Sequence, residues 1–201
     1  MISTIIFDVG EVLLTGLKGV EHRLSPLVGI PASQIFAEPT SQWDLVKELF
    51  NGEITEDQFV DRVLQTSKWR LSPLILKKII RENFAEIEGT RNIVESLHKK
   101  GFKLGLLSDH AREWVDHCNE KFNHHAHFHA KVYSFDVGAT KPHKKGYLAL
   151  LEKLDSKPYE SIFIDDNPRN LAAAKEIGIK IIQFKDAGQL RKDLALFGVH
   201  V

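Results

Sequence analysis

The chain has 201 residues, 43% of them hydrophobic, and 27 Lys and Arg residues balance 27 Asp and Glu residues to leave no formal net charge at pH 7. A chain of this length can bury one substantial core, while the lack of excess positive charge excludes the electrostatic footprint of a nucleic-acid-binding or membrane-surface protein and favours a small ligand. The single cysteine, Cys118, and an N-terminus without the layout of a signal peptide predict a cytoplasmic protein with no nucleic-acid or membrane partner.

Five short runs of apolar and β-branched residues have the composition of strands that are buried on both faces. They cover residues 4–7, 103–107, 131–133, 161–164 and 180–184. Helical patterns alternate with the later runs, such as the segment that Pro168 opens and that stops at Gly178. This alternation predicts an α/β fold with a doubly wound, Rossmann-like parallel sheet covered by helices.

Residues 15–88 interrupt the alternation, because they contain several helix starts and no convincing strand. Thr55 begins a capping-box pattern, and Ser72 precedes a proline ahead of another apolar stripe. The sequence thus predicts a helical cap of residues 15–88 inserted into an α/β core of residues 1–14 and 89–201. An insertion directly after the first strand lies near the carboxyl ends of the strands, where open sheets bind ligands, so it is a candidate lid.

Four aromatic residues lie in this insertion: Trp43, Phe50, Phe59 and Trp69. We expect them to form the small core of the cap. The alternative is that Trp43 or His22 faces the site and contacts a sugar ring of the substrate.

Polar residues follow three of the predicted strands at the points where the strands end. Asp8 follows the first strand, Ser108 ends the second, and Asp165 and Asp166 follow the fourth, while Lys141 precedes a proline between the last two groups. In a parallel sheet these ends share one edge, so the carboxylates would repel one another unless a cation neutralised them. Mg²⁺ suits this set because it binds carboxylates, waters and phosphate oxygens. A carboxylate beside Mg²⁺ and Lys141 can attack phosphorus, with Ser108 hydrogen-bonded to the transferring group.

The order and spacing of four motifs resemble those of the haloacid dehalogenase-like (HAD) hydrolases. The matching segments are residues 5–12, 106–108, 141–142 and 164–167, with Asn170 after the last. The insertion is similar to the helical cap of the family, and the glycine in the first motif resembles a branch of small sugar phosphatases. The resemblance implies a phosphoric monoester hydrolase that uses Mg²⁺, forms an aspartyl phosphate and acts on a small phosphorylated metabolite.

Carried over by position, the resemblance implies a role for each motif residue. Asp8 would be the nucleophile, and Ser108 and Lys141 would bind the phosphoryl group. The residues implied at the metal are Asp8, Gly10 through its carbonyl, and Asp166, with Asp165 and Asn170 behind them.

Two residues beside the motifs are further substrate-binding candidates. Asp109 stands where the family usually has Asn, and the favoured interpretation is that it caps the following helix rather than contacts substrate. Glu11 lies directly after the first motif's glycine, and the sequence leaves the direction of its side chain open.

One position departs from the family pattern. Gly10 stands where the family has a second Asp, which protonates the leaving group and later activates water, and such a group typically contributes about 10²–10⁴ in rate. Three interpretations remain open. The substrate has a leaving group that needs no proton, such as an anomeric sugar phosphate; Glu11 or a cap residue supplies the proton; or the protein binds its ligand without turnover.

Two further hypotheses are less favoured. A 2-haloacid dehalogenase also lacks the second Asp, but Asp165 and Asp166 indicate Mg²⁺ and phosphate instead. In the histidine-rich run of residues 124–129, His127 and His129 would share one strand face and could bind Zn²⁺ or Ni²⁺, although a solvated loop is the favoured interpretation.

Overall fold

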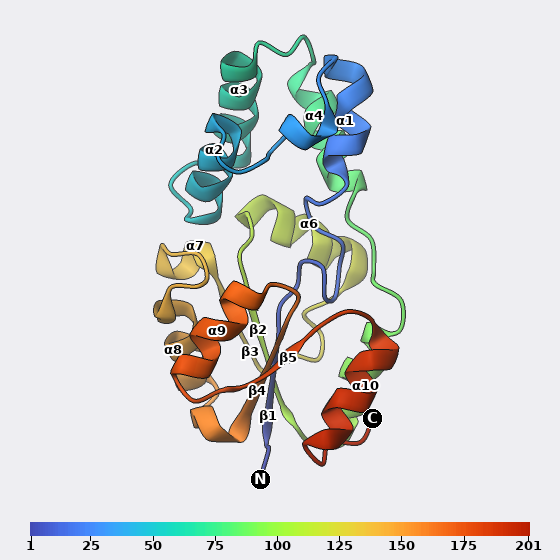
Figure 1. The fold of residues 1–201 in the computed structure, drawn as a ribbon, viewed down its shortest axis with the longest axis vertical. Coiled ribbons are helices and arrows are strands. Elements are labelled where there is room, and N and C mark those ends of the chain that lie inside the picture. Colours follow the sequence, from blue (N-terminus) through green and yellow to red (C-terminus); the bar gives the residue numbers. More distant parts are fainter.

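The computed structural model describes all 201 residues, and its centre is one five-stranded sheet in which every strand pair is parallel. In spatial order the strands are β3 (Ala130–Tyr133), β2 (Lys103–Ser108), β1 (Thr4–Phe7), β4 (Ser161–Asp165) and β5 (Lys180–Gln183). Each strand matches a predicted apolar run to within one residue at either end. The predicted doubly wound α/β fold is therefore confirmed (Figure 1).

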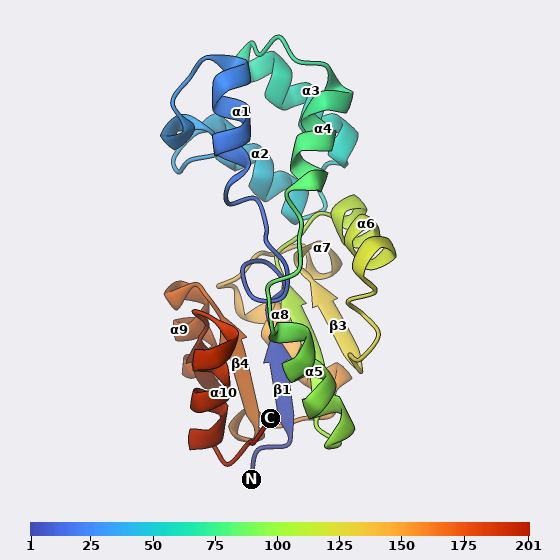
Figure 2. The same cartoon turned by 90° about the vertical axis from the view of Figure 1, so that its right-hand side faces the viewer.

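Helices cover both faces of the sheet, which explains why its central strands are apolar on both sides. One face packs against α5 (Thr90–Lys99), α6 (Arg112–Phe122) and α10 (Ala187–Leu196), and the other against α8 (Lys144–Lys153) and α9 (Pro168–Glu176) (Figure 2). Along β1, Ile5 and Phe7 belong to the first apolar cluster and Ile6 to the second, as the strand pleat requires. None of the helices combines the length and the apolar character that a membrane crossing needs.

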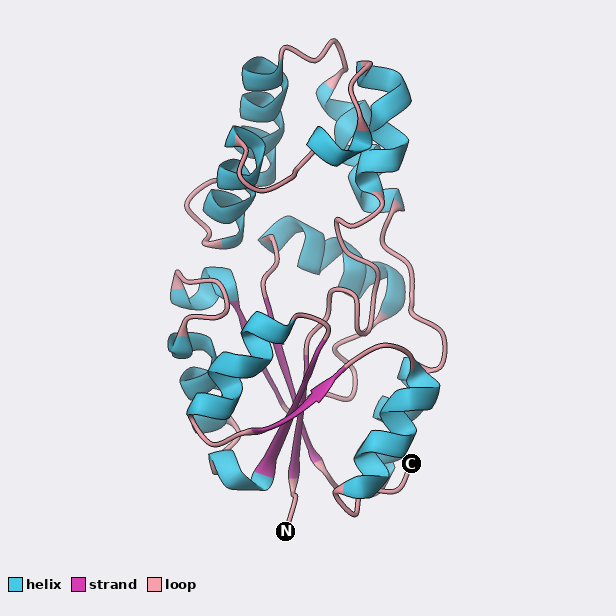
Figure 3. Ribbon diagram, in the orientation of Figure 1, coloured by secondary structure: helices cyan, strands magenta, loops and turns pink.

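Four helices form a separate layer beyond the carboxyl ends of the strands, and this layer contains no strand (Figure 3). The members of this helical layer are α1 (Val20–Val28), α2 (Ser41–Phe50), α3 (Glu56–Ser67) and α4 (Pro73–Glu82). The predicted helix starts are confirmed: Thr55 forms a capping box at α3, and Ser72 accepts a hydrogen bond from the Ile75 N–H at α4. Short helical segments lie at residues Ala32–Gln34, Pro158–Glu160 and α7 (Ser134–Val137).

Two linkers, residues 14–19 and 83–89, join the helical layer to the rest of the chain and run side by side. Leu14 pairs with Glu86 in an antiparallel bridge. The Thr15 N–H donates to the Ala85 carbonyl at 2.9 Å, and the Ala85 N–H donates to the Thr15 hydroxyl at 2.9 Å. Because these hydrogen bonds hold the linkers to each other, the layer enters and leaves the sheet edge at one place.

Candidate functional site

The carboxyl ends of β1 and β4 bring three acidic side chains together. Phe7 pairs in register with Ile164, so that Asp8 emerges beside Asp165. Asp8, Asp165 and Asp166 each have a carboxylate oxygen within 4.8 Å of the others. The parallel register therefore produces the acidic edge that the sequence predicts.

Lys141 lies among these acids. Its Nζ is 2.8 Å from Asp8 Oδ2 and 2.7 Å from Asp165 Oδ2, and its side chain is 4% exposed. It also donates to the Leu107 carbonyl at 3.4 Å. One ammonium group thus contacts two buried carboxylates, and hydrogen bonds to charged groups of this kind are the strong ones.

Asp109 positions this lysine through the backbone. Both of its carboxylate oxygens accept the Lys141 N–H, at 2.9 and 3.1 Å. The interpretation of Asp109 as the cap of the following helix is wrong, because Ala111 occupies the N-cap position of α6 and no side chain caps that helix. The Asp109 side chain turns instead toward the segment that carries Lys141.

Asn170 and Asn167 hold Asp165. The Asn170 side-chain amide donates to both Asp165 oxygens, at 3.2 and 3.1 Å, and the Asn167 N–H donates to Oδ1 at 2.7 Å. With Lys141 on Oδ2, the lone pairs of Asp165 are largely occupied. The side-chain amide of Asn170 therefore holds the Asp165 carboxylate in place.

Burial and the closeness of like charges shift the pKa values of the ionisable groups at this edge. Burial raises the pKa of the Asp8 carboxyl to about 8, against the opposing charge of Lys141 and with a contribution from Asp165. Burial and the neighbouring Asp165 also raise the pKa of Asp166. Burial alone would lower the pKa of Lys141, but the Asp165 and Asp8 carboxylates outweigh it and raise the pKa, so the lysine stays charged.

A divalent cation fits this set of donors. Three acids with converging oxygens face a single ammonium group, and a hard cation such as Mg²⁺ prefers carboxylate oxygens. Its charge would favour the ionised forms of Asp8 and Asp166, whose pKa values burial and, to a smaller extent, the charge of Asp165 raise. The residues present therefore suit a Mg²⁺ site.

Ser108, at the end of β2, carries a hydroxyl that no protein group satisfies. The residue is 1% exposed, and its buried Oγ has no hydrogen-bond partner. A buried polar atom without a partner costs free energy. The next residue, Asp109, lines the open cavity. The Ser108 hydroxyl is therefore well placed to donate a hydrogen bond to a ligand oxygen.

An open cavity of about 410 Å³ lies between the sheet edge and the helical layer. Asp8, Lys141 and Asp166 line it from the sheet, and Trp43 and Phe50 line it from α2. Both aromatic residues are half-buried. Both also pack against the main apolar cluster, so the prediction that they belong to the layer's own core holds only in part, because α2 leaves one side of each ring facing the cavity.

The other two aromatic residues of that prediction do pack inside the helical layer. Phe59 and Trp69 are 0% and 8% exposed. Both contact Phe36, at ring-centroid distances of 6.0 and 6.1 Å.

Glu11 points toward the first linker. Its Oε1 accepts the Gly16 N–H at 2.9 Å, and its backbone φ is 58°, in the left-handed region. The half-buried side chain lines the cavity, and burial raises its pKa. Glu11 therefore ties the loop after β1 to the linker, a role that the sequence does not reveal.

His110 lines the cavity and is not among the residues predicted from the sequence. It is 5% exposed, and its Nδ1 accepts the Ala111 N–H at 3.1 Å, which leaves the proton of the neutral ring on Nε2. Burial lowers its pKa to about 4. The sequence does contain one indication of this position. His110 is two residues after Ser108, and residues that directly follow the end of a strand lie at the edge of the sheet where the site forms.

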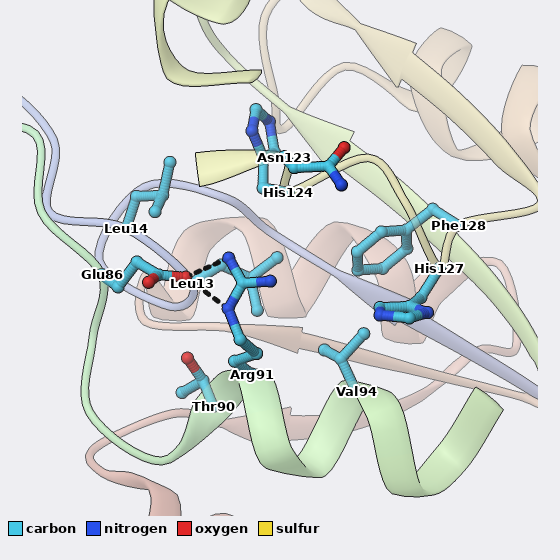
Figure 4. Close-up of a pocket in the computed structure, with 10 residues that line it drawn as sticks. All are labelled: Leu13, Leu14, Glu86, Thr90, Arg91, Val94, Asn123, His124, His127 and Phe128. Atoms are coloured by element: carbon cyan, nitrogen blue, oxygen red, sulfur yellow. Dashed lines mark hydrogen bonds and ion pairs between the residues drawn. The ribbon is translucent and has the colours of Figure 1, made fainter. Parts of the chain in front are cut away.

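A second, much smaller hollow of about 30 Å³ lies behind the linkers (Figure 4). Leu14 and Glu86 of the linkers form one wall, with Arg91 paired to Glu86, and His124 and His127 form another. Most of the histidine-rich run therefore forms a turn, and two of its histidines line this hollow.

The predicted shared strand face for His127 and His129 is wrong, because β3 begins only at Ala130. The His129 Nδ1 instead accepts the Leu104 N–H at 3.0 Å. The carboxylates at the sheet edge form the one group of three or more metal-ligating side chains with converging donor atoms.

Buried His124 makes the stability of the fold sensitive to acid. It is 8% exposed, and burial, followed by the charge of neighbouring His125, lowers its pKa to about 3. An unfolded chain ionises histidine near pH 6.5, so below that pH the unfolded state takes up a proton that the folded state does not, and the free energy of unfolding falls.

When the pH is lowered from about 7.5 to about 5, the free energy of unfolding should fall in the unsubstituted protein. We expect this fall to be smaller in His124→Gln, by up to about 2 kcal/mol. Urea unfolding at the two pH values measures the difference. His22→Gln is the control, since the His22 side chain is 76% exposed. An equal pH response in the two variants would contradict the assignment.

Comparison with known proteins places these motifs in context. The profile of the family described as haloacid dehalogenase-like hydrolase matches residues 20–184. Flavin mononucleotide hydrolase 1 from Arabidopsis thaliana is 29% identical over 126 residues, which are 63% of this chain and 51% of that relative. The chain thus spans about half the length of this curated relative.

Solved structures share the fold over the whole chain. A predicted HAD-like hydrolase from Porphyromonas gingivalis superposes with a TM-score of 0.81 at 18% identity and covers 100% of both chains. A HAD family enzyme from Bacteroides thetaiotaomicron, solved with magnesium and inorganic phosphate, has a TM-score of 0.76 at 18% identity and covers 92% of this chain and 96% of its own.

Proposed function

The chain belongs to the haloacid dehalogenase-like hydrolases, and on that premise we propose that it is a Mg²⁺-dependent phosphatase of a small phosphorylated metabolite. The observation that carries the proposal is the buried contact of Asp8 with Lys141, 2.8 Å apart at the floor of the cavity. A relative named as a flavin mononucleotide hydrolase and a fold neighbour that holds magnesium and phosphate support it.

Asp8 is the proposed nucleophile. One of its oxygens attacks the phosphorus of the ester, and the bond from phosphorus to the leaving oxygen breaks, with the electron pair going to that oxygen. Water then attacks the phosphorus of the aspartyl phosphate and the bond from phosphorus to the Asp8 oxygen breaks, which releases orthophosphate and restores the carboxylate. One proton of the water stays on the orthophosphate, and the other passes through solvent to the oxygen that has left. The Val9 N–H donates to Asp8 Oδ1 at 2.7 Å, which orients the carboxylate before the attack.

Lys141 and Ser108 are the proposed ligands of the phosphoryl oxygens. The ammonium group offsets the repulsion between the Asp8 carboxylate and the anionic substrate, and the unpartnered Ser108 hydroxyl supplies a hydrogen bond. Asp109 and Glu11 line the cavity beside them and remain candidates for contact with the rest of the substrate.

The proposed Mg²⁺ ligands are Asp8, Asp166 and the carbonyl of Gly10, with Asp165 and Asn170 holding the arrangement from behind. When bound, Mg²⁺ supplies positive charge that allows the anionic nucleophile and the phosphate to approach each other.

We propose further that residues 15–88, which contain the helical layer and most of the two linkers, act as the cap domain of an α/β core formed by residues 1–14 and 89–201. The layer covers the carboxyl ends of the strands and contributes Trp43 and Phe50 to the cavity (Figure 1).

Gly10 restricts the proposed substrates. No carboxyl group occupies the first motif's acid position, so esters with a good leaving group, such as anomeric sugar phosphates, are favoured. The same observation supports a second candidate function, in which the protein binds a phosphorylated ligand without turnover.

Binding of Mg²⁺ should stabilise the folded protein. At a concentration near 100 times the dissociation constant, Mg²⁺ is expected to raise the Tm by roughly 5–10 °C, as measured by differential scanning calorimetry. Asp166→Asn should lose most of this rise, whereas Asp61→Asn, on an exposed position of α3, should keep it. A rise that survives in Asp166→Asn would contradict the proposed ligand set.

A phosphate-ester panel tests the function directly. Orthophosphate release is measured for aryl phosphates, anomeric sugar phosphates and alkyl phosphates, with Mg²⁺ and with EDTA. The proposal predicts Mg²⁺-dependent release from the first two groups. Stabilisation by Mg²⁺ without release from any ester would favour the binding function, and halide release from 2-haloacids without metal would overturn both.

A further inference from the structure

One buried carboxylate of the helical layer reaches across to the α/β part of the chain. Glu56, the first residue of α3, has a side chain that is 2% exposed. Its Oε1 accepts a hydrogen bond from the indole Nε1 of Trp114, on α6, at 2.8 Å. The backbone N–H of Glu56 donates to Glu113 Oε1, also on α6, at 3.2 Å. Two hydrogen bonds therefore join the start of α3 to α6.

Arg81 makes this buried charge tolerable. Its Nε is 3.0 Å from Glu56 Oε1, and its Nη2 contacts Oε2. Lys77 lies 3.8 Å from the same carboxylate. A buried carboxylate is costly unless it is paired and hydrogen-bonded, and here α4 supplies the charge while α6 supplies the remaining donor. We call Glu56, Arg81, Glu113 and Trp114 the Glu56 latch.

The ring of Trp114 packs into the helical layer from the core side. Trp114 is 1% exposed, and its ring lies 5.9 Å from Phe50 of α2, 6.0 Å from Phe59 of α3 and 5.8 Å from Phe84 of the second linker. These are edge or tilted contacts of the kind that aromatic pairs prefer. Three of the four aromatic rings around Trp114 thus belong to the helical layer or its linker, and the fourth is His110 at 6.0 Å.

A second contact lies nearby, between α2 and α7. At Gly52, just after α2, a Cβ atom would come within 3.0 Å of Phe135 Cβ, so the backbone closely approaches α7. Figure 1 shows α2 above α7, and α6 below the helical layer. The layer is therefore attached at the linkers and again along α6 and α7.

We infer that Glu56 is a positioning residue, which fastens the helical layer over the sheet edge through Trp114 in the ligand-free protein and so holds Trp43 and Phe50 above Asp8. A lid that swung on the linkers alone would have to break this contact and expose Trp114. The cavity consequently keeps its shape between substrates, and esters are selected by whether they fit the existing space. The inference deepens the proposed phosphatase function and rests on it only for its kinetic consequence.

Two substitutions separate the latch from general stability. Trp114→Phe keeps an aromatic ring but removes the N–H that Glu56 accepts, and Glu56→Gln keeps an acceptor but removes the charge that Arg81 pairs with. The matched controls are Trp69→Phe, a buried ring inside the layer, and Glu48→Gln, whose ion pair with Arg62 joins α2 to α3 without reaching α6.

Hydrogen exchange by mass spectrometry on the ligand-free proteins gives a readout that needs no turnover. Trp114→Phe and Glu56→Gln should speed exchange in the peptides covering the start of α3 and the start of α6, and the two controls should not. For an ester that the protein hydrolyses, both latch variants should raise KM by about tenfold with kcat little changed, as expected if the closed population falls to about a tenth.

Exchange rates in the latch variants that match those of the controls would overturn the inference. So would equal KM increases in all four variants, which would indicate a general loss of stability. If Glu56→Gln fails to fold, Trp114→Phe decides the question. If no ester is hydrolysed, the proposed function fails while the exchange result still decides whether the latch exists.

Discussion

Asp8→Asn is expected to lower Mg²⁺-dependent phosphate release by at least about 10⁴-fold, the scale seen when a catalytic nucleophile is removed. Asparagine has nearly the same size, and its amide oxygen can still accept the Val9 N–H that Asp8 accepts at 2.7 Å. A neutral amide cannot attack phosphorus, however. The measurement is kcat/KM for an aryl phosphate at saturating Mg²⁺.

The matched control for this substitution is Asp61→Asn, which makes the same chemical change at an exposed position of α3. It should keep full activity. Urea unfolding checks that Asp8→Asn remains folded, since it removes one of the two carboxylates that Lys141 contacts. Equal activity in the two variants would rule out Asp8 as the nucleophile.

Gly10→Asp is expected to raise the hydrolysis of alkyl phosphates by about 10²–10⁴-fold and to leave aryl phosphates nearly unchanged. The reason is that only the poor leaving group needs the proton that the new carboxyl group supplies. The position has room, because a Cβ at Gly10 would meet no atom within 4 Å, and Gly10 lines the cavity. The measurement is kcat/KM for a matched pair of alkyl and aryl esters.

Gly10→Asn is the control, because it adds a side chain of the same shape without an acidic proton. A gain in Gly10→Asp alone supports chemistry limited by the leaving group. An equal gain in both variants would show an effect of packing, and no gain in either would show that another residue already supplies the proton.

The sheet and its acidic edge could be predicted because the signals are local. Each strand is a short apolar run, and the polar residues that follow β1, β2 and β4 must meet where parallel strands end. The register of Phe7 with Ile164 then places Asp8 beside Asp165 without any further information.

Contacts between distant segments could not be predicted in the same way. Asp109 accepts a hydrogen bond from the backbone N–H of Lys141, 32 residues away in the sequence. Glu56 accepts one from the indole N–H of Trp114, 58 residues away. Both partners depend on how the helices pack, and neither residue type identifies its partner. For the same reason the sequence does not reveal that Trp43 lines the cavity.

The covalent intermediate offers the most direct test of the central claim that Asp8 carries the phosphoryl group. The protein is mixed with an aryl phosphate and Mg²⁺, quenched in acid during turnover and digested for mass spectrometry. We predict that the peptide containing Asp8 gains the mass of one phosphoryl group and that Asp8→Asn shows no such gain. Turnover with the phosphoryl group on any other residue would contradict the account.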